Sequence, residues 1–209
     1  MSIIGKLSSS TGKRSKETNK ALAANIVRSD DHGAVNELVQ LLEHKNKNIQ
    51  SDAIETLYEA GYLNPAILST HVTSFAQLLK SKNNRLVWGG MIALSSVSEV
   101  AADKVFSFLS ELETAVNKGS VITKDAGITA YANLAMDDKF KIKVIPLLFN
   151  EMKICPIKQL PQYAEKSVKA INSVNKNEFI ELINFRLGEF NKESQIKRIN
   201  KVLKNVERL

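Results

Sequence analysis

The chain has 209 residues, of which 44% are hydrophobic and 24% charged, and its 29 Lys and Arg against 22 Asp and Glu give a net charge of +7. This apolar fraction excludes a wholly disordered chain, and a single cysteine excludes a disulfide scaffold or a multi-cysteine metal cluster. Nine glycines and four prolines are too few for a loop-rich all-β protein. The length suits one compact domain or a short array of repeats.

The charge is unevenly distributed along the chain. Residues 1–20 have five basic and one acidic residue, and residues 150–209 have 12 basic and seven acidic residues. The middle of the chain, residues 21–149, has 12 basic and 14 acidic residues. Basic ends around a near-neutral middle could attract nucleic acid or an acidic partner, or could only keep the protein soluble.

The sequence contains no stretch typical of a signal peptide or a membrane span. Ile3 and Ile4 are too short an apolar run for a signal-peptide core. The most apolar stretch, residues 86–97, is interrupted by two serines and is well short of the roughly 20 residues that a spanning helix needs. We therefore expect no transmembrane segment, and the unpaired thiol indicates a cytoplasmic location.

In chain order, residues 1–15 are basic and Ser-rich without apolar periodicity, which predicts a mobile tail before a single repeat domain at 16–209. After the tail, apolar residues recur at three- and four-residue steps, and strand signals are almost absent. Asn64 before Pro65 is typical of a helix start. The predicted helices span 16–29, 31–44, 47–60, 64–81, 84–99, 102–118, 120–136, 138–153, 160–173, 176–189 and 192–207.

An internal repeat organises these helices. The segment 49–57 aligns with 86–94 at an offset of 37 residues, so that the small Ala53 falls on Gly90 and Leu57 falls on Leu94. A third copy follows 36 residues later, and weaker copies follow around Ala164 and Arg198. The preceding helices repeat as well, so each unit is a helix A, a polar turn and a helix B. One such hairpin cannot bury its apolar face alone, which predicts stacking of the hairpins.

This pattern resembles HEAT repeats, in particular the small bacterial HEAT-like proteins of armadillo type. Ile49, Leu86 and Ile122 correspond to the apolar start of the family's helix B, and residues 146–148 are similar to the Pro-Leu-Leu of its helix A. An arginine is typical near the start of the family's helix B, and another residue occupies that position in each copy here. Over about residues 31–209, the resemblance implies an all-α, right-handed α-α superhelix of about five helical hairpins, which serves as a binding scaffold.

No residue pattern predicts catalysis, a metal or a cofactor. His32, His44 and His71 lie in different units without ligand spacing, and Cys155 follows an apolar helix, where we expect a structural thiol. No phosphate-binding glycine motif occurs, and Gly89-Gly90 is expected to allow close helix packing. We therefore predict no metal site, no cofactor and no enzyme activity.

A possible relation to HEAT-like DNA glycosylases is also disfavoured. That activity uses tryptophans and an Asp one turn beyond one of them, whereas Ile92 follows Trp88 by four residues and no second tryptophan exists. Asp52 and Asp125 occupy equivalent places in two units, where we expect inter-repeat hydrogen bonds.

The B helices are expected to line the concave face of such a solenoid, which is the usual binding surface. Trp88 is the only tryptophan, and its repeat equivalents are polar. Aromatic and cationic residues on one face suit protein hot spots and stacked bases equally. A large residue at the core edge is the alternative for Trp88. The predicted partner-binding residues are Ser51, Glu55, Tyr58, Arg85, Trp88, Lys124, Tyr131, Gln162, Tyr163 and Lys166.

The last helix is amphipathic, with a basic face that could contact phosphates or remain a solvated face of a terminal cap. Its basic residues are Lys197, Arg198, Lys201 and Lys204. The leading hypothesis is a non-catalytic HEAT-like scaffold that binds a protein through its concave B-helix face. The alternative is a nucleic-acid-binding solenoid that uses a basic groove and the basic C-terminal helix.

Overall fold

The computed structural model describes residues 2–11 and 16–209, and within these ranges it contains α-helices and short 3-10 helices without a strand. No helix in the described ranges has the length and hydropathy needed to cross a membrane. The sequence predicts a single domain from residue 16, whereas the contacts group the chain into two compact units, the first ending at Gly127 and the second spanning Ile128–Leu209. The two units are described separately.

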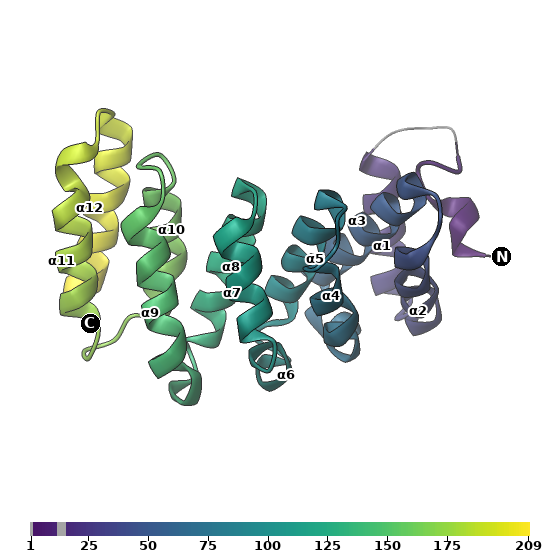
Figure 1. Ribbon diagram of the computed structural model, residues 1–209, viewed down its shortest axis with the longest axis horizontal. Coiled ribbons are helices and arrows are strands. Elements are labelled where there is room, and N and C mark those ends of the chain that lie inside the picture. Colours follow the sequence, from purple (N-terminus) through teal and green to yellow (C-terminus); the bar gives the residue numbers. More distant parts are fainter. Residues whose placement is uncertain (1, 12–15) are drawn as a thin grey trace. The chain divides into compact units, whose positions relative to one another are not determined.

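In the first unit, α3 packs between α1 and α5 (Figure 1). Each pair of A and B helices forms a hairpin, and α8 continues into the second unit. The elements are η1 (Ile3–Lys6), α1 (Lys16–Arg28), α2 (His32–Gln40), η2 (Leu41–Glu43), α3 (Lys47–Leu63), η3 (Pro65–His71), α4 (Val72–Leu78), α5 (Asn84–Val97), α6 (Ala102–Phe106), α7 (Leu109–Lys118) and α8 (Val121–Leu134).

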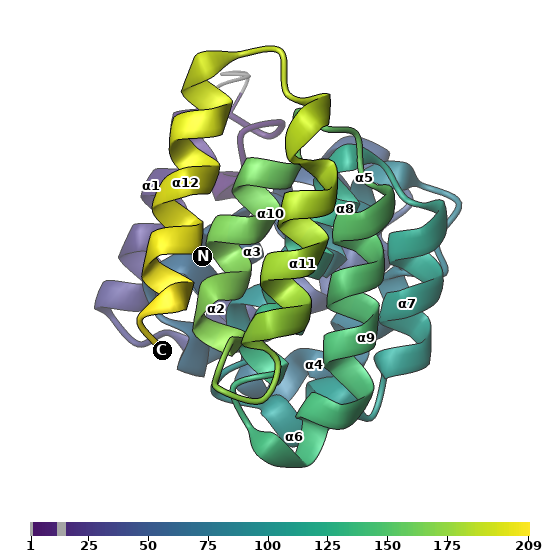
Figure 2. The ribbon, with the colours of Figure 1, turned by 90° about the vertical axis from the view of Figure 1, so that its left-hand side faces the viewer.

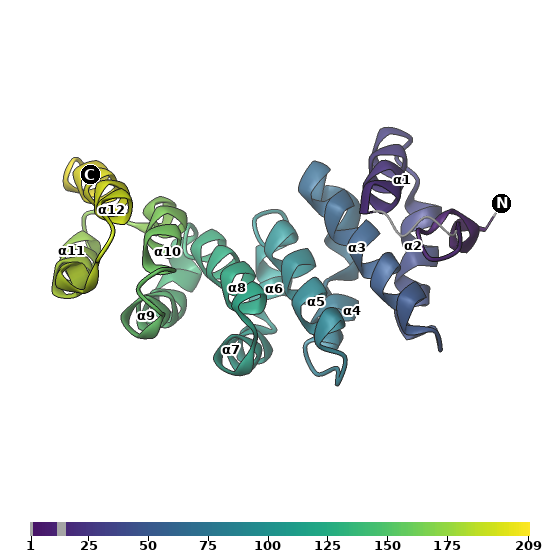
Figure 3. The same cartoon turned by 90° about the horizontal axis from the view of Figure 1, so that it is seen from above.

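The second unit repeats the hairpin plan. Its four main helices have roughly aligned axes (Figure 2), with the B helices α10 and α12 on one side and the A helices α9 and α11 on the other (Figure 3). The elements are α9 (Asp138–Ile154), α10 (Leu160–Ser167), η4 (Val168–Ala170), α11 (Lys176–Arg186), η5 (Leu187–Glu189) and α12 (Glu193–Glu207). The predicted all-α fold of helical hairpins is therefore confirmed.

Short polar side chains determine where several helices begin. Asn46 and Asn83 precede the B helices α3 and α5, and each side-chain oxygen accepts a hydrogen bond from the backbone N–H two residues later. Asn64 does the same before Pro65. Such caps satisfy backbone donors that the first helical turn leaves without partners, and they explain why the predicted starts are close to the observed ones.

The small residues of the repeat allow close helix packing. A Cβ atom added at Gly90 would lie 2.9 Å from the backbone oxygen of Phe75 and 2.9 Å from the Cβ atom of Leu78, both on α4. A Cβ atom added at Gly89 would lie 2.6 Å from a side-chain carbon of Ile54 on α3. The predicted packing role of the glycine pair is therefore confirmed, because α5 approaches both neighbouring helices at these two residues.

The N-terminal segment, which we define as residues 2–11, packs on the first unit. Ile3 and Leu7 are buried, and the backbone N–H of Ile3 donates a hydrogen bond of 2.9 Å to Glu37 Oε1 on α2. In residues 2–11 the predicted tail is therefore packed against the first unit, because the buried Ile3 and Leu7 anchor a segment that is too short to show periodicity. Residues 12–15 of the predicted tail lie outside the described residues.

Candidate functional site

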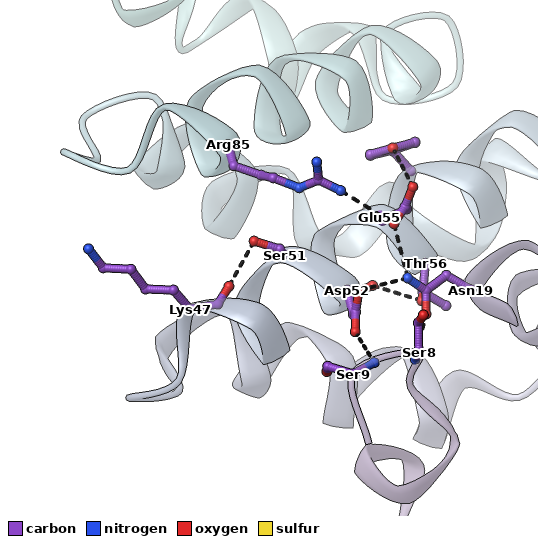
Figure 4. Close-up of polar contacts among 10 residues, drawn as sticks. Ser8, Ser9, Asn19, Lys47, Ser51, Asp52, Glu55, Thr56 and Arg85 are labelled. Atoms are coloured by element: carbon purple, nitrogen blue, oxygen red, sulfur yellow. Dashed lines mark hydrogen bonds and ion pairs between the residues drawn. The ribbon is translucent and has the colours of Figure 1, made fainter. Parts of the chain in front are cut away.

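Four of the predicted binding residues come together where α3 meets α5, and two of them, Glu55 and Arg85, are labelled in Figure 4. Arg85 Nη2 lies 3.4 Å from Glu55 Oε2, and the Arg85 guanidinium carbon lies 5.0 Å from the centre of the Trp88 ring. The Tyr58 and Trp88 ring centres are 6.0 Å apart. Because Arg85 and Trp88 are three residues apart on one helix, they project on the same side and can stack.

Glu55 is a buried carboxylate whose partners come from two helices. Its side chain is 4% exposed, and it accepts hydrogen bonds from Arg85 on α5 and from Asn19 Nδ2 on α1, the latter at 3.0 Å. Tyr58 Oη donates a longer one, of 3.4 Å. A buried charge is tolerated only when it is paired and hydrogen-bonded, so these contacts hold three helices in one arrangement.

The same cluster raises the pKa values of two tyrosines. Burial raises the pKa of Tyr58 well above its usual range, and the carboxylates of Glu55 and Glu59 raise it further. Burial also raises the pKa of Tyr62, with added effects of Glu59 and Asp125. Both phenols therefore remain neutral hydrogen-bond donors across the physiological pH range.

Asn19 extends the network to the N-terminal segment (Figure 4). Its side-chain Nδ2 donates to Asp52 Oδ1 at 2.9 Å as well as to Glu55, and its Oδ1 accepts from the backbone N–H of Ser8 at 3.1 Å. Asp52 Oδ2 accepts from the backbone N–H of Ser9 at 2.6 Å. The predicted inter-helix hydrogen bond of Asp52 is thus confirmed, with α1 as the neighbouring helix.

Sequence reasoning did not find Asn19 or Tyr62. Asn19 lies on α1, which precedes the first recognised repeat, so no aligned column includes it. Tyr62 follows Tyr58 by four residues, and that helical spacing was the available signal. Its ring centre lies 6.0 Å from that of Tyr58, and the residue is 60% exposed.

We define the aromatic strip as Tyr62, Tyr58, Trp88 and Arg85. Within the strip, Tyr58 is buried, Trp88 is half-buried, and the Arg85 side chain is 38% exposed. The strip therefore presents a cation, an indole and a phenol to solvent above a fixed polar network. Because Trp88 is half-buried, it fits both the predicted surface position and the alternative prediction of a large residue at the edge of the core.

Two other predicted residues of the first unit lie on α3 and α8. The hydroxyl of Ser51 donates to the backbone oxygen of Lys47 at 2.7 Å, within its own helix. Lys124 is half-buried on α8.

In the second unit, the structure corrects the placement of two predicted aromatics. Tyr131 and Tyr163 are each 1% exposed, so they are core residues and not aromatic inserts on a surface. Both rings pack inward, where burial of a large apolar area stabilises the unit. Gln162 and Lys166 are half-buried, and Lys166 lines a surface pocket together with Lys169.

The basic face of α12 is partly used by ion pairs. Arg198 donates two hydrogen bonds, of 2.8 and 2.7 Å, to the carboxylate of Glu165 on α10, and this contact lowers the pKa of Glu165. Lys197 lies 2.7 Å from Glu193 on its own helix. Lys201 and Lys204 are exposed. Arg198 therefore joins α12 to α10 through this ion pair.

Cys155 lies in the core of the second unit, as predicted for a structural thiol. It is 4% exposed, and burial raises the pKa of its thiol. Arg186 Nη1 donates to the backbone oxygens of Met152 and Cys155, at 2.9 and 2.7 Å, at the C-terminal end of α9. The guanidinium thus satisfies carbonyls that have no intrahelical partner.

No group of three His, Cys, Asp or Glu residues within the described ranges is arranged to hold a metal ion. The polar residues of the first unit instead form a network of carboxylates, amides and one guanidinium. Such a network can orient side chains and accept hydrogen bonds from the backbone of a bound segment.

The sequence matches no protein-family model and no curated protein, but several solved structures are similar. A computationally designed armadillo repeat protein for modular peptide recognition has 14% identity and a TM-score of 0.69, over 97% of this chain and 98% of that one. A designed armadillo repeat protein in complex with the peptide (KR)4 has 16% identity and a TM-score of 0.66, over 98% and 89%.

A natural neighbour is Kap121p bound to Pho4p, with 17% identity and a TM-score of 0.64 over 88% of this chain and 20% of that one. At these identities the likeness establishes the fold alone. The chain has the fold of armadillo and HEAT-like repeat proteins, a helical solenoid, which confirms the resemblance found in the sequence.

Proposed function

We propose that this protein is a non-catalytic repeat scaffold that binds another protein through the B-helix surface of its first unit. We define this surface by the exposed residues of α1, α3 and α5. It corresponds to the first part of the face that the sequence predicts to be concave. We also retain the cytoplasm as the predicted location.

The aromatic strip is the observation that carries this proposal. Tryptophan, tyrosine and arginine dominate the energetic hot spots of protein interfaces, because they combine a large apolar area with directed polar contacts. Trp88 and Arg85 are held by the Glu55 network, so little side-chain entropy remains to be lost on binding. The fold neighbours support the idea, since one is in complex with a peptide and another is bound to Pho4p.

Affinity capture with matched variants tests the proposal. The full-length protein, Trp88→Ala and Tyr62→Ala would be used as baits, and captured proteins would be identified by mass spectrometry. Phe185→Ala is the control, because Phe185 is an aromatic residue that is 89% exposed on an A helix of the other unit. We expect the two strip variants to lose partners that Phe185→Ala retains. An identical set of partners for all four baits would reject the strip as the binding surface.

A second candidate function, nucleic-acid binding, is favoured by the charge of the second unit. Residues 128–209 contain 15 basic and nine acidic residues, against 14 and 13 in residues 1–127. Titration with labelled single- and double-stranded nucleic acids at low and physiological salt would test this. Affinity that falls steeply with salt and is weakened by Lys201→Glu with Lys204→Glu would support it, because phosphate contacts release counterions. Absence of binding at physiological salt would reject it.

A further inference from the structure

The N-terminal segment is attached to the B-helix surface in the way that a bound peptide would be. Leu7 is fully buried, and the next two residues donate backbone N–H groups to the side chains of Asn19 and Asp52. The acceptors belong to two different helices, α1 and α3. The segment is therefore held by two buried apolar side chains, Ile3 and Leu7, and by hydrogen bonds from its backbone N–H groups, which a segment of any sequence other than proline can donate.

This mode of attachment is not restricted to the chain's own sequence. Every non-proline residue has a backbone N–H group, so an extended segment of another protein can donate the same two hydrogen bonds. Recognition of extended peptides commonly uses main-chain hydrogen bonds for affinity and side-chain pockets for specificity. Here the site occupied by Leu7 supplies such a pocket for a single apolar side chain.

The segment is also continuous with the aromatic strip. Asn19 Nδ2 donates to both Asp52 and Glu55, and Glu55 is paired with Arg85, which stacks on Trp88. Figure 4 shows Ser8 and Ser9 on one side of this network and Arg85 on the other. The segment thus occupies one end of the surface to which we assign partner binding.

We propose that residues 2–11 are an intramolecular ligand of the B-helix surface, which an extended segment of the protein partner displaces. The incoming segment places an apolar residue in the Leu7 site and donates its next two backbone N–H groups to Asn19 and Asp52. The identity of the displacing partner rests on the proposed function, whereas reversible docking of the segment does not. The two statements can therefore fail separately.

Amide hydrogen exchange of the full-length protein is the first test. Because local segments open independently of global unfolding, we expect the Ser8 and Ser9 amides to exchange about 10-fold or more slower than in a free peptide, yet about 100-fold faster than core amides of α3 such as Leu57. Exchange as slow as that of Leu57 would overturn the proposal, because the segment would then open only with the fold. Exchange at the free-peptide rate would also overturn it.

The second test uses the full-length variant Leu7→Asp and a labelled synthetic peptide of residues 2–11. The charged side chain should release the segment, so that the peptide binds the variant about 10-fold or more tightly than the wild type, whose own segment competes at high effective concentration. Trp88 emission and peptide anisotropy would report binding. The control peptide has Leu7→Asp and should bind neither protein.

Equal binding of the peptide to both proteins, or to neither, would overturn the proposal. Loss of the helical circular dichroism signal in Leu7→Asp would also overturn it, because a displaceable segment cannot be required for the fold. These measurements involve no partner protein. A negative result here leaves the partner-capture experiment informative, and failure of the strip variants in that experiment leaves segment docking in place.

Discussion

The two units share one hairpin plan but use their polar residues differently. In the first unit, a buried carboxylate, Glu55, joins three helices and pairs with Arg85, which stacks on the half-buried indole of Trp88. In the second unit, the tyrosines of the B helices are in the core, and buried Arg186 satisfies the end of a single helix. The repeat pattern therefore specifies the helices, whereas the few polar and aromatic residues of the B helices differ in burial and partners between the units.

The largest expected effect comes from breaking the network of the first unit. Asn19→Leu removes the donor shared by Asp52 and Glu55 and leaves a buried charge with fewer partners, which should cost about 3 kcal/mol of unfolding free energy. Urea unfolding followed by circular dichroism measures this. Asn19→Asp keeps the side-chain shape but adds a third carboxylate beside Asp52 and Glu55, so we expect it to lower the unfolding free energy further. Stability equal to that of the wild type would contradict a structural role for the network.

Removal of Arg186 is the corresponding test in the second unit. Arg186→Met keeps much of the side-chain volume but leaves the carbonyls of Met152 and Cys155 without this donor, at an expected cost of about 2 kcal/mol. Urea unfolding of the full-length variant gives the value. Because Cys155 is buried and reacts only when the unit opens, the lost stability should also make thiol labelling faster. An unchanged labelling rate and midpoint would show that the contact contributes little.

A smaller loss is expected at the glycine pair. Gly90→Ala improves helix propensity, but its methyl group would lie 2.9 Å from the fixed backbone oxygen of Phe75. We expect a net destabilisation of about 1–2 kcal/mol, because overpacking against backbone cannot be relieved by rotating a side chain. Ala164→Gly, at the equivalent repeat position of the second unit, is the matched control and should cost about 1 kcal/mol through helix propensity. A stabilised Gly90→Ala variant would contradict the close approach of α4 and α5.

The smallest effect concerns pH. The pKa of Glu165 is lower in the folded protein because Arg198 donates to its carboxylate, so the contact stabilises the fold above the ordinary Glu pKa and is lost as the pH falls through the folded value. Since both side chains are more than a third exposed, solvent limits the effect to about 0.5 kcal/mol or less. Stability curves of wild type and Arg198→Met should converge at acidic pH. Parallel curves would exclude the ion pair as the cause.

Much of the helical organisation follows directly from the sequence. Apolar residues at helical spacing, polar caps such as Asn46 and Asn83, and small residues at repeat positions are local signals, and the observed helices begin within a few residues of the predicted starts. These signals are strong because hydrophobic burial and backbone hydrogen bonding act on nearby residues.

The surface was less predictable, for a geometric reason. The offset between repeats varies from 36 to 38 residues, and an alignment error of one residue rotates a side chain by about 100° around the helix axis. Such a rotation is enough to confuse core and surface. For Tyr131, however, the column was aligned correctly and its face was misjudged, because the equivalent residues Tyr58 and Ser95 are buried too. The N-terminal segment was missed because its hydrogen bonds come from backbone N–H groups, which have no signature in the sequence.

The central claim, that the aromatic strip is the partner-binding surface, is tested most directly by acrylamide quenching of Trp88, the only tryptophan. A partner or partner peptide obtained by capture, chosen or engineered to lack tryptophan, would be added to the full-length protein. Our account predicts that bound partner shields Trp88 and lowers its quenching constant, with the same effect in Phe185→Ala. Saturated binding with unchanged quenching of Trp88 would contradict the account.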